Sequence, residues 1–314
     1  MPRLVYAIGA AAAAAALALS TAVTTALPAT AAAAEQPSTT HATYYLALGD
    51  SLSVGDQPNA KGVTLPTSHG YADQLYATLH KTDASLHFYK LGCPGETSAT
   101  MNKGGVCGYK GDDRYSLTAR KGNQLAAALD FIQRHRGQVT LITLDIGAND
   151  LNGCIALGSI PKIENCVPPV FAAIEKNLAA TLEALRAAAP KATIAGMTYY
   201  DPELVAWLTG KSGQTFAQGS VALAGVFGEI LTGVYEKLGA LVADMFTSFD
   251  TTDITQLVNV PGHGKLPKDV AVICKWTFEC TRPPIGPDEH GTNQGYGAMS
   301  STFLATLRKA GFKA

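Results

Sequence analysis

The chain has 314 residues, of which 47% are hydrophobic and 16% are charged, and its formal net charge is −1. This composition predicts a chain that folds around a substantial core, and it excludes a largely disordered protein. The near-neutral charge, without a run of Lys or Arg, excludes the basic stripe of a nucleic-acid-binding protein.

The N-terminal segment is typical of an export signal. A single arginine precedes an uncharged, alanine-rich stretch over residues 4–34, which ends in small-x-small triplets of the kind that signal peptidase cleaves. We therefore predict a signal peptide over residues 1–34, a flexible leader over 35–43 and a secreted, extracellular protein. A membrane anchor is the alternative, but Ser and Thr dilute the stretch, and a spanning helix needs about 20 apolar residues. We expect no later segment to be long and apolar enough to span a membrane, so we predict no stable membrane insertion.

Short apolar runs alternate with helical patterns over the rest of the chain. The runs, which predict buried strands, cover residues 44–48, 86–91, 139–144, 192–197 and 240–245. The predicted helices cover residues 71–80, 117–135, 170–189, 216–238 and 292–309, and the stretch 249–285, rich in Gly, Pro and Thr, is expected to be irregular. This alternation predicts one α/β domain over residues 44–314, a three-layer α/β/α sandwich with a mostly parallel, flavodoxin-like sheet of about five strands.

Six cysteines follow the predicted signal, an even number that indicates disulfides in an exported chain. Six cysteines allow 15 pairings. Because they fall along the chain as three close pairs, we favour Cys93–Cys107, Cys154–Cys166 and Cys274–Cys280. The alternative is a metal site, but no CxxC spacing is present, and we predict no metal.

A serine directly follows the first predicted strand. Ligands of parallel α/β sheets bind beyond the carboxyl ends of the strands, where Ser51 would lie. The segment does not fit the G-x-S-x-G elbow of α/β-hydrolases, because Ser53 stands where that motif has its second glycine. Ser51 is therefore either a nucleophile or a serine that caps a turn or a helix.

Four short blocks lie at the ends of predicted strands or before the last predicted helix. They are Leu48-Gly49-Asp50-Ser51-Leu52-Ser53, Leu91-Gly92-Cys93-Pro94-Gly95-Glu96-Thr97, Asp145-Ile146-Gly147-Ala148-Asn149-Asp150, and Asp288-Glu289-His290 with Asn293 and Gly295-Tyr296 after it. In content and order they resemble the blocks of the SGNH (GDSL-type) hydrolase family, most closely its secreted actinobacterial lipases and esterases. The resemblance implies the SGNH hydrolase fold.

The resemblance also implies a role for each block. Ser51 is the implied nucleophile and His290 the implied base, with His69 and His263 as rival bases in loops. The implied oxyanion donors are the backbone N–H groups of Ser51 and Gly95 and the side chain of Asn149; taken alone, Gly95 and Asn149 could equally be turn residues. Donors held in place for the developing oxyanion are what ester hydrolysis needs.

The last block departs from the family pattern. The family has an aspartate three residues before the histidine, where this chain has Pro287, and Asp288 lies two residues before His290. The third catalytic group is then either Asp288 or the backbone carbonyl of Pro287, because something must orient the imidazole.

We predict a secreted esterase or lipase that cleaves carboxylic esters through an acyl-serine intermediate, as a monomer and without a cofactor. The alternatives within the fold are a carbohydrate acetyl esterase and a phospholipase. A secreted domain that only binds lipid or wall polymer is the non-enzymatic alternative. The predicted helix over 216–238 could line an acyl pocket, although packing in the core explains its apolar residues more simply.

Overall fold

Five parallel strands form the central sheet of the described part of the chain. The structure is a computed structural model that describes residues 42–110, 114–116 and 122–313, so the predicted signal peptide and most of the predicted leader lie outside it. The strands are β1 (Thr43–Gly49), β4 (Leu86–Lys90), β7 (Val139–Asp145), β8 (Thr193–Met197) and β9 (Leu241–Ala243). Their order in the sheet is β4-β1-β7-β8-β9, which confirms the predicted flavodoxin-like arrangement.

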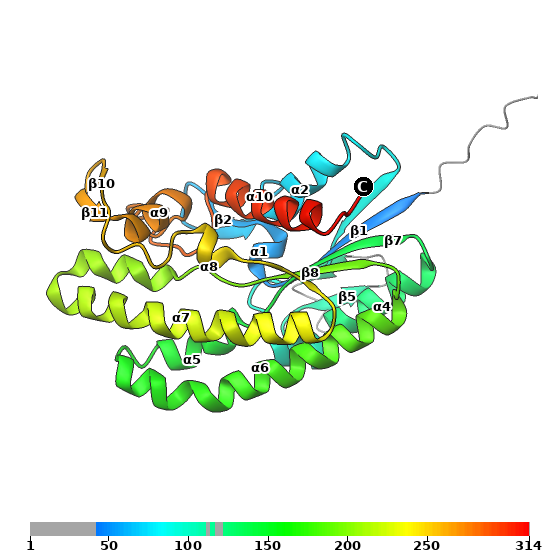
Figure 1. Cartoon of the computed structure of the whole chain (residues 1–314), viewed down its shortest axis with the longest axis horizontal. Coiled ribbons are helices and arrows are strands. Elements are labelled where there is room, and N and C mark those ends of the chain that lie inside the picture. The colour runs from blue at the N-terminus through cyan, green and yellow to red at the C-terminus, as the bar shows by residue number, and fades with distance from the viewer. Residues whose placement is uncertain (1–41, 111–113, 117–121, 314) are drawn as a thin grey trace, which may run out of the picture. The chain divides into compact units, whose positions relative to one another are not determined.

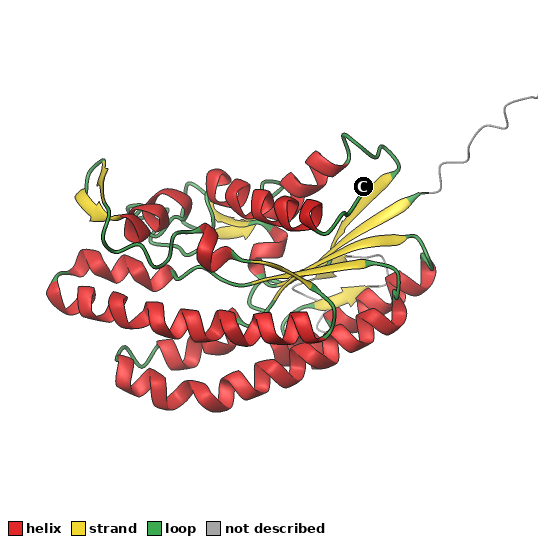
Figure 2. Cartoon of the chain, in the orientation of Figure 1, coloured by secondary structure: helices red, strands yellow, loops and turns green. Residues whose placement is uncertain are grey.

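Helices cover both faces of this sheet, which confirms the predicted α/β sandwich (Figures 1 and 2). The helices are α1 (Ser51–Val54), α2 (Tyr71–Leu79), α3 (Ser98–Lys103), α4 (Gln124–Arg134), α5 (Asn152–Ile155), α6 (Ile160–Ala188), α7 (Lys211–Lys237), α8 (Met245–Ser248), α9 (Lys268–Trp276) and α10 (Asn293–Lys309), with 3₁₀ helices η1 (Ala148–Leu151) and η2 (Pro202–Thr209). In Figure 1, α2 and α10 lie above the sheet and α4, α6 and α7 lie below it. Three small antiparallel hairpins flank the layers: β2 (Asp56–Pro58) with β3 (Thr64–Pro66), β5 (Gly108–Lys110) with β6 (Arg114–Ser116), and β10 (Leu257–Val260) with β11 (Gly264–Pro267).

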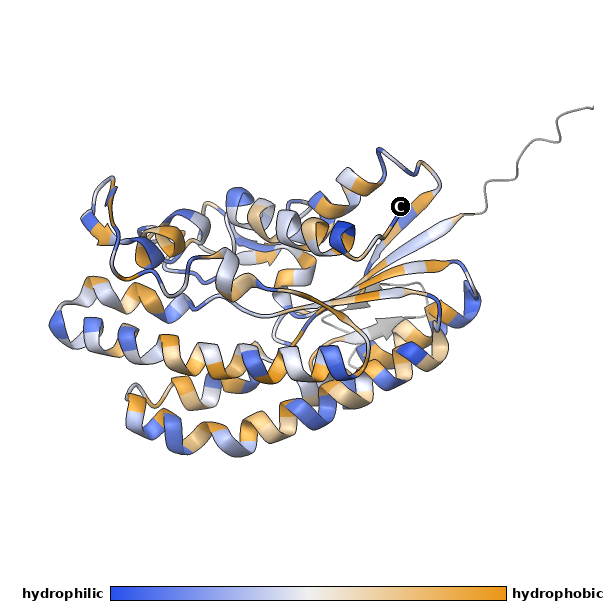
Figure 3. Cartoon of the chain, viewed as in Figure 1, coloured by the Kyte–Doolittle hydropathy of each residue, from blue (hydrophilic) through white to orange (hydrophobic). Residues whose placement is uncertain are grey.

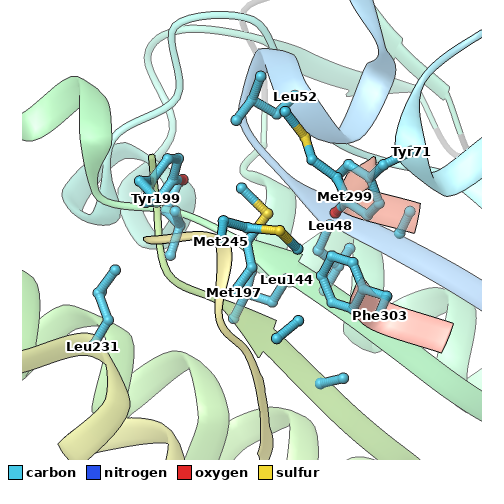
Figure 4. Close-up of a cluster of buried hydrophobic side chains, with 14 of the residues drawn as sticks. Leu48, Leu52, Tyr71, Leu144, Met197, Tyr199, Leu231, Met245, Met299 and Phe303 are labelled. Carbon is cyan, nitrogen blue, oxygen red and sulfur yellow. The ribbon is translucent and has the colours of Figure 1, made fainter. Parts of the chain in front are cut away.

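The core lies on both faces of the sheet because the inner strands β1, β7 and β8 are buried on both sides. Leu46, Leu48 and Leu144 are fully buried. On the face covered by α2 and α10, the rings of Tyr71 and Phe303 stack with their centroids 4.8 Å apart (Figure 4). Strands buried on both faces read as continuous apolar runs, which is why they were visible in the sequence.

Helix α6 begins ten residues before the expected start at residue 170, and it contains Pro168 and Pro169. A proline inside a helix removes one backbone hydrogen bond and crowds the preceding turn, so the pair of prolines favoured a later start. The buried side chains of Ile163, Val167 and Phe171 lie on one face of the helix and continue the pattern across the prolines. Tertiary packing therefore overrides the local preference.

Two other expectations about secondary structure were wrong in part. The stretch 249–285 was expected to be irregular, but it contains the β10–β11 hairpin and helix α9, whose apolar face is too short to stand out among Gly and Pro. The helix expected over 117–135 begins at Gln124, where the Asn123 side chain accepts a hydrogen bond from Ala126 N at 2.7 Å. Residues 117–121 of that expectation lie outside the described residues.

Helix α7 is 27 residues long and, among the described residues, is the one helix long and apolar enough to cross a membrane by length and composition. The expectation that no segment after residue 34 reaches this threshold was therefore wrong. In the structure α7 packs on α6 and η2 and against strands β8 and β9. Its apolar residues are thus used, at least in part, inside the fold.

Candidate active site

Ser51 is the first residue of α1, directly beyond the end of β1. The turn requires Gly49, because its φ is +135° and a Cβ there would lie 2.1 Å from the backbone oxygen of Asp145. The Asp50 side chain caps α1 by accepting a hydrogen bond from Leu52 N at 3.0 Å. The Ser51 side chain is consequently held at the sheet edge between β1 and β7, where the strand order reverses and ligands of such folds bind.

Asn149 occupies the corresponding position after β7, in η1. One N–H of its side-chain amide donates to the backbone oxygen of Glu96 at 3.0 Å, and its Oδ1 accepts from Asn152 Nδ2 at 3.3 Å. An amide nitrogen carries two N–H donors, so a second remains. Asn149 and Ser51 line the same cavity.

Gly95 lies in the turn after β4, the strand on the other side of β1. Its φ is +76°, a conformation that favours glycine. The residue is exposed, and it is not among the described residues that line the cavity around Ser51. The backbone oxygen of the next residue, Glu96, accepts the hydrogen bond from Asn149. This bond connects the segment of Gly95 to the other predicted donor, Asn149.

His290 lies in the loop between α9 and α10 and lines the same cavity as Ser51 and Asn149. Its Nδ1 lies 2.8 Å from Oδ1 of Asp288, which also accepts a hydrogen bond from the His290 backbone N–H at 2.9 Å. The Asp288 carboxylate, one of the two groups considered from the sequence, is thus the hydrogen-bond partner of the imidazole Nδ1. The buried Nε2 has no hydrogen-bond partner among the described residues. His69 and His263 are exposed and lie outside the cavity lining.

The two groups of this pair shift each other's pKa. Burial lowers the pKa of His290, but the hydrogen bond and negative charge of Asp288, with Glu289 and Asp56 nearby, raise it above its usual 6.5. Burial raises the pKa of Asp288, but the hydrogen bonds from His290 and Thr64 bring it below its usual value. The pair therefore favours a charged carboxylate beside an imidazole that binds a proton readily.

Two buried carboxyl groups behind Ser51 were not singled out in the sequence. The Asp50 backbone N–H donates to Oδ2 of Asp145 at 3.3 Å, and Tyr199 donates to Oδ2 of Asp50 at 2.7 Å. Asp145 accepts from Ser53 N at 3.1 Å and from the Tyr71 hydroxyl. Burial raises the pKa of both acids, and the charge of Asp50 raises that of Asp145 further. A signal was present, since both residues end apolar strands.

The cavity beside these residues has a volume of about 440 Å³ and continues as an apolar seam between α6 and α7. The seam consists of Ile160, Ile163, Val167 and Phe171 from α6 and Phe216, Ser220, Leu223, Ala224 and Phe227 from α7. Both sets recur every three or four residues, so each helix turns one stripe toward the seam. Figure 3 shows apolar and polar residues alternating along both helices, and Figure 1 shows them running past the ends of the strands.

The direction of the seam follows from its contacts. Phe227 lies at the sheet end, stacked on Tyr199 at 5.7 Å between ring centroids and on Phe171 at 5.9 Å. Ile160 packs on α7 at the other end, where a Cβ added to Gly219 would lie 2.7 Å from its Cγ1. The lining residues of each helix span twelve residues, about 16 Å of helix axis. The seam therefore leads from the sheet edge outward between two parallel helices.

Asp201 and Glu203, both at the start of η2, interrupt the apolar lining. Asp201 is 3% exposed, and its carboxylate accepts a hydrogen bond from Ser220 Oγ at 2.6 Å. Burial raises the pKa of Asp201 to about 7. The seam can therefore hold this acid in its neutral form near neutral pH, which limits the charge beside the apolar side chains.

All six cysteines are paired, as Cys93–Cys107, Cys154–Cys166 and Cys274–Cys280. These are the pairs favoured from the sequence. Cys154–Cys166 joins α5 to the N-terminal part of α6, and Cys274–Cys280 joins α9 to the loop that leads to His290. No group of three His, Cys, Asp or Glu side chains in the part of the chain that the structure describes is arranged to hold a metal ion.

Comparison with known proteins agrees with this architecture. Residues 47–262 match the model of the GDSL-like lipase/acylhydrolase family. Among solved structures, phospholipase A1 from Streptomyces albidoflavus is 17% identical with a TM-score of 0.53, over 87% of this chain and 100% of that one. An extracellular lipase from Streptomyces rimosus is 16% identical with a TM-score of 0.53, over 86% and 100%. At these identities the structures establish the fold alone. No curated protein matched the sequence.

Proposed function

The family match over residues 47–262 covers more than half of the chain, which therefore belongs to the GDSL-like lipase/acylhydrolase family. We propose that the protein is a serine esterase that cleaves carboxylic esters with an extended acyl chain. One observation carries the proposal. Ser51, Asn149 and His290, whose imidazole is bonded to Asp288, line one end of a cavity whose remaining length is mostly apolar.

In the proposed reaction, the Ser51 hydroxyl attacks the ester carbonyl while Nε2 of His290 takes up its proton. The alcohol leaves with that proton, and an acyl group remains on the serine. Water, deprotonated by His290 in turn, then releases the acid. Asp288 holds Nδ1 and stabilises the imidazolium, a role that fits its short contact with His290. This chemistry requires no cofactor.

The negative oxygen formed in each step needs donors held in advance. We assign this role to the backbone N–H groups of Ser51 and Gly95 and to the free N–H of Asn149. The three residues follow the neighbouring strands β1, β4 and β7. The contact between Asn149 and the backbone of Glu96 supports a common site, whereas the exposure of Gly95 leaves it the least supported of the three.

The seam favours an acyl chain over an acetyl group as the acid part of the substrate. Burial of apolar groups gains about 0.8 kcal/mol for each methylene, and the seam offers about 16 Å of mostly apolar wall. An acetyl group would leave this length empty. Acetylated sugars are therefore the weaker alternative, while a phospholipid, which also carries long acyl chains, stays within the proposal.

We further propose that the protein is exported. Three disulfides are typical of proteins that mature outside the cytosol, and the N-terminal sequence has the pattern of a cleaved signal. The proposed active unit is a single chain, because Ser51, Asn149 and His290 all come from it.

Hydrolysis of p-nitrophenyl esters tests the proposal. We expect the wild-type protein to hydrolyse these esters and Ser51→Ala to fall to the background rate. Ser53→Ala, on the same short helix, removes a hydroxyl that bonds to the Asp50 backbone at 2.7 Å and does not line the cavity, so it should retain turnover. Equal rates for wild type and Ser51→Ala would refute the proposed esterase activity. The alternative of a domain that only binds lipid or polymer would then remain.

A further inference from the structure

The β2–β3 hairpin lies against the loop that carries His290, although more than 200 residues separate them along the chain. Gln57 Nε2 donates to the Gly291 backbone oxygen at 2.9 Å and to Asn293 Oδ1 at 3.0 Å. At the hairpin tip, Gly62 approaches Pro284 so closely that an added Cβ would lie 1.8 Å from its backbone oxygen. The hairpin therefore contacts the loop on both sides of the imidazole.

Between these contacts, the Thr64 hydroxyl donates a hydrogen bond of 2.6 Å to Oδ2 of Asp288. The other carboxylate oxygen, Oδ1, already serves two donors, the backbone N–H and Nδ1 of His290. Oδ2 has no other hydrogen-bond partner in the described part of the chain, so Thr64 alone fixes that side of the carboxylate.

The spacing of the acid explains why such a fixing contact matters here. An aspartate two residues before the histidine bonds to the backbone N–H of that histidine, a local turn that aspartate adopts readily. The terminal torsion of an aspartate is broad, so this turn by itself does not hold the carboxylate plane on Nδ1. A second anchor on Oδ2 removes that freedom.

We propose that Thr64 is a positioning residue that holds the Asp288 carboxylate on Nδ1 of His290. The proposal rests on the proposed esterase function. Thr64 acts through Asp288 and does not touch the reacting atoms. Its loss should therefore lower the rate of the chemical steps and leave substrate binding in the seam unchanged.

The test compares Thr64→Val, Thr64→Ala and Thr64→Ser with Thr67→Val in p-nitrophenyl ester hydrolysis. Thr67 is a matched control, because its hydroxyl bonds to the Gly55 backbone at 2.6 Å in the same segment and has no contact with Asp288. We expect Thr64→Val and Thr64→Ala to lower kcat about tenfold with KM little changed, since a hydrogen bond to a charged group is lost. Thr64→Ser should restore kcat, and Thr67→Val should keep it. Thermal unfolding of each variant separates this effect from loss of fold.

A double-mutant cycle then locates the effect. In an Asp288→Asn background, Thr64→Val should cause little further loss, because the oriented carboxylate is already gone. The proposal would be overturned by any of three results. These are a wild-type kcat in both Thr64→Val and Thr64→Ala, a loss of kcat in Thr67→Val equal to that in Thr64→Val, or a double variant in which the losses of kcat from Thr64→Val and Asp288→Asn multiply in full. An inactive wild type, or activity that survives in Ser51→Ala, would instead overturn the esterase.

Discussion

Around Ser51 the cavity is bounded by short segments that follow β1 and β7, whereas its far end lies between the long helices α6 and α7. The sheet end presents the Ser51 hydroxyl, the Asn149 amide bonded to the Glu96 backbone, and the His290 imidazole bonded to the Asp288 carboxylate. The seam presents side chains that are held by packing. Under the proposed function, this difference separates two tasks: the groups at the sheet end would act on the reacting carbonyl of any ester, while the seam would act only on an acyl chain that reaches it.

The largest effect expected from this division, beyond the loss of Ser51 itself, is at Asn149. Asn149→Ala should lower kcat by about 10²–10³, since it removes one donor for the oxyanion. The loss should be similar for p-nitrophenyl acetate and p-nitrophenyl laurate, because both pass through the same oxyanion. A loss confined to the longer ester would assign Asn149 to the seam and break the division.

The pH dependence of kcat/KM gives a second, smaller effect at the same end. His290 must be neutral to act as a base, and its pKa is raised above its usual 6.5 by Asp288 and the nearby acids Glu289 and Asp56, which outweigh burial. Activity should therefore fall as the pH decreases through an apparent pKa above 6.5, about tenfold for each further unit. The acid limb should coincide for short and long esters. An apparent pKa below 6.5 for this acid limb would contradict a negatively charged Asp288 beside Nδ1.

The smallest effect should come from the seam and should depend on chain length. Ala224→Phe fills the space between the two helices, so kcat/KM should drop about tenfold for p-nitrophenyl laurate and stay near wild type for the acetate. The matched control is Val226→Phe, two residues away on the same helix, where the side chain is 46% exposed and outside the cavity lining. Equal losses on both esters would mean that the seam does not hold the acyl chain.

The sequence was more informative about the sheet end than about the helices of the seam. The five strands and the positions of Ser51 and Asn149 could be predicted, because continuous apolar runs mark buried strands and the polar residues follow them directly. The start of α6 could not be predicted, because Pro168 and Pro169 oppose a helix locally and the burial of Ile163 and Val167, which offsets them, is a matter of tertiary structure.

Contacts between distant segments were the hardest to foresee. Thr64 lies on a strand of three residues, and nothing near it in the sequence points to Asp288, which is 224 residues away. Whether Asp288 or the Pro287 carbonyl lies against the imidazole of His290 depends on the orientation of a side chain, which spacing in the sequence does not determine. Likewise, that Asp50 and Asp145 meet behind Ser51 follows only once β1 and β7 are known to be neighbours.

The two prolines of α6 have a consequence for how the seam can move. Neither residue has an amide hydrogen, so the first turns of α6, before the prolines, lack two backbone hydrogen bonds of a regular helix. What secures this turn is its apolar contact with α7 and the Cys154–Cys166 crosslink. We therefore expect residues 160–169 to separate from α7 at a lower free energy than global unfolding, so that the outer wall of the seam opens while the strands next to Ser51 stay folded.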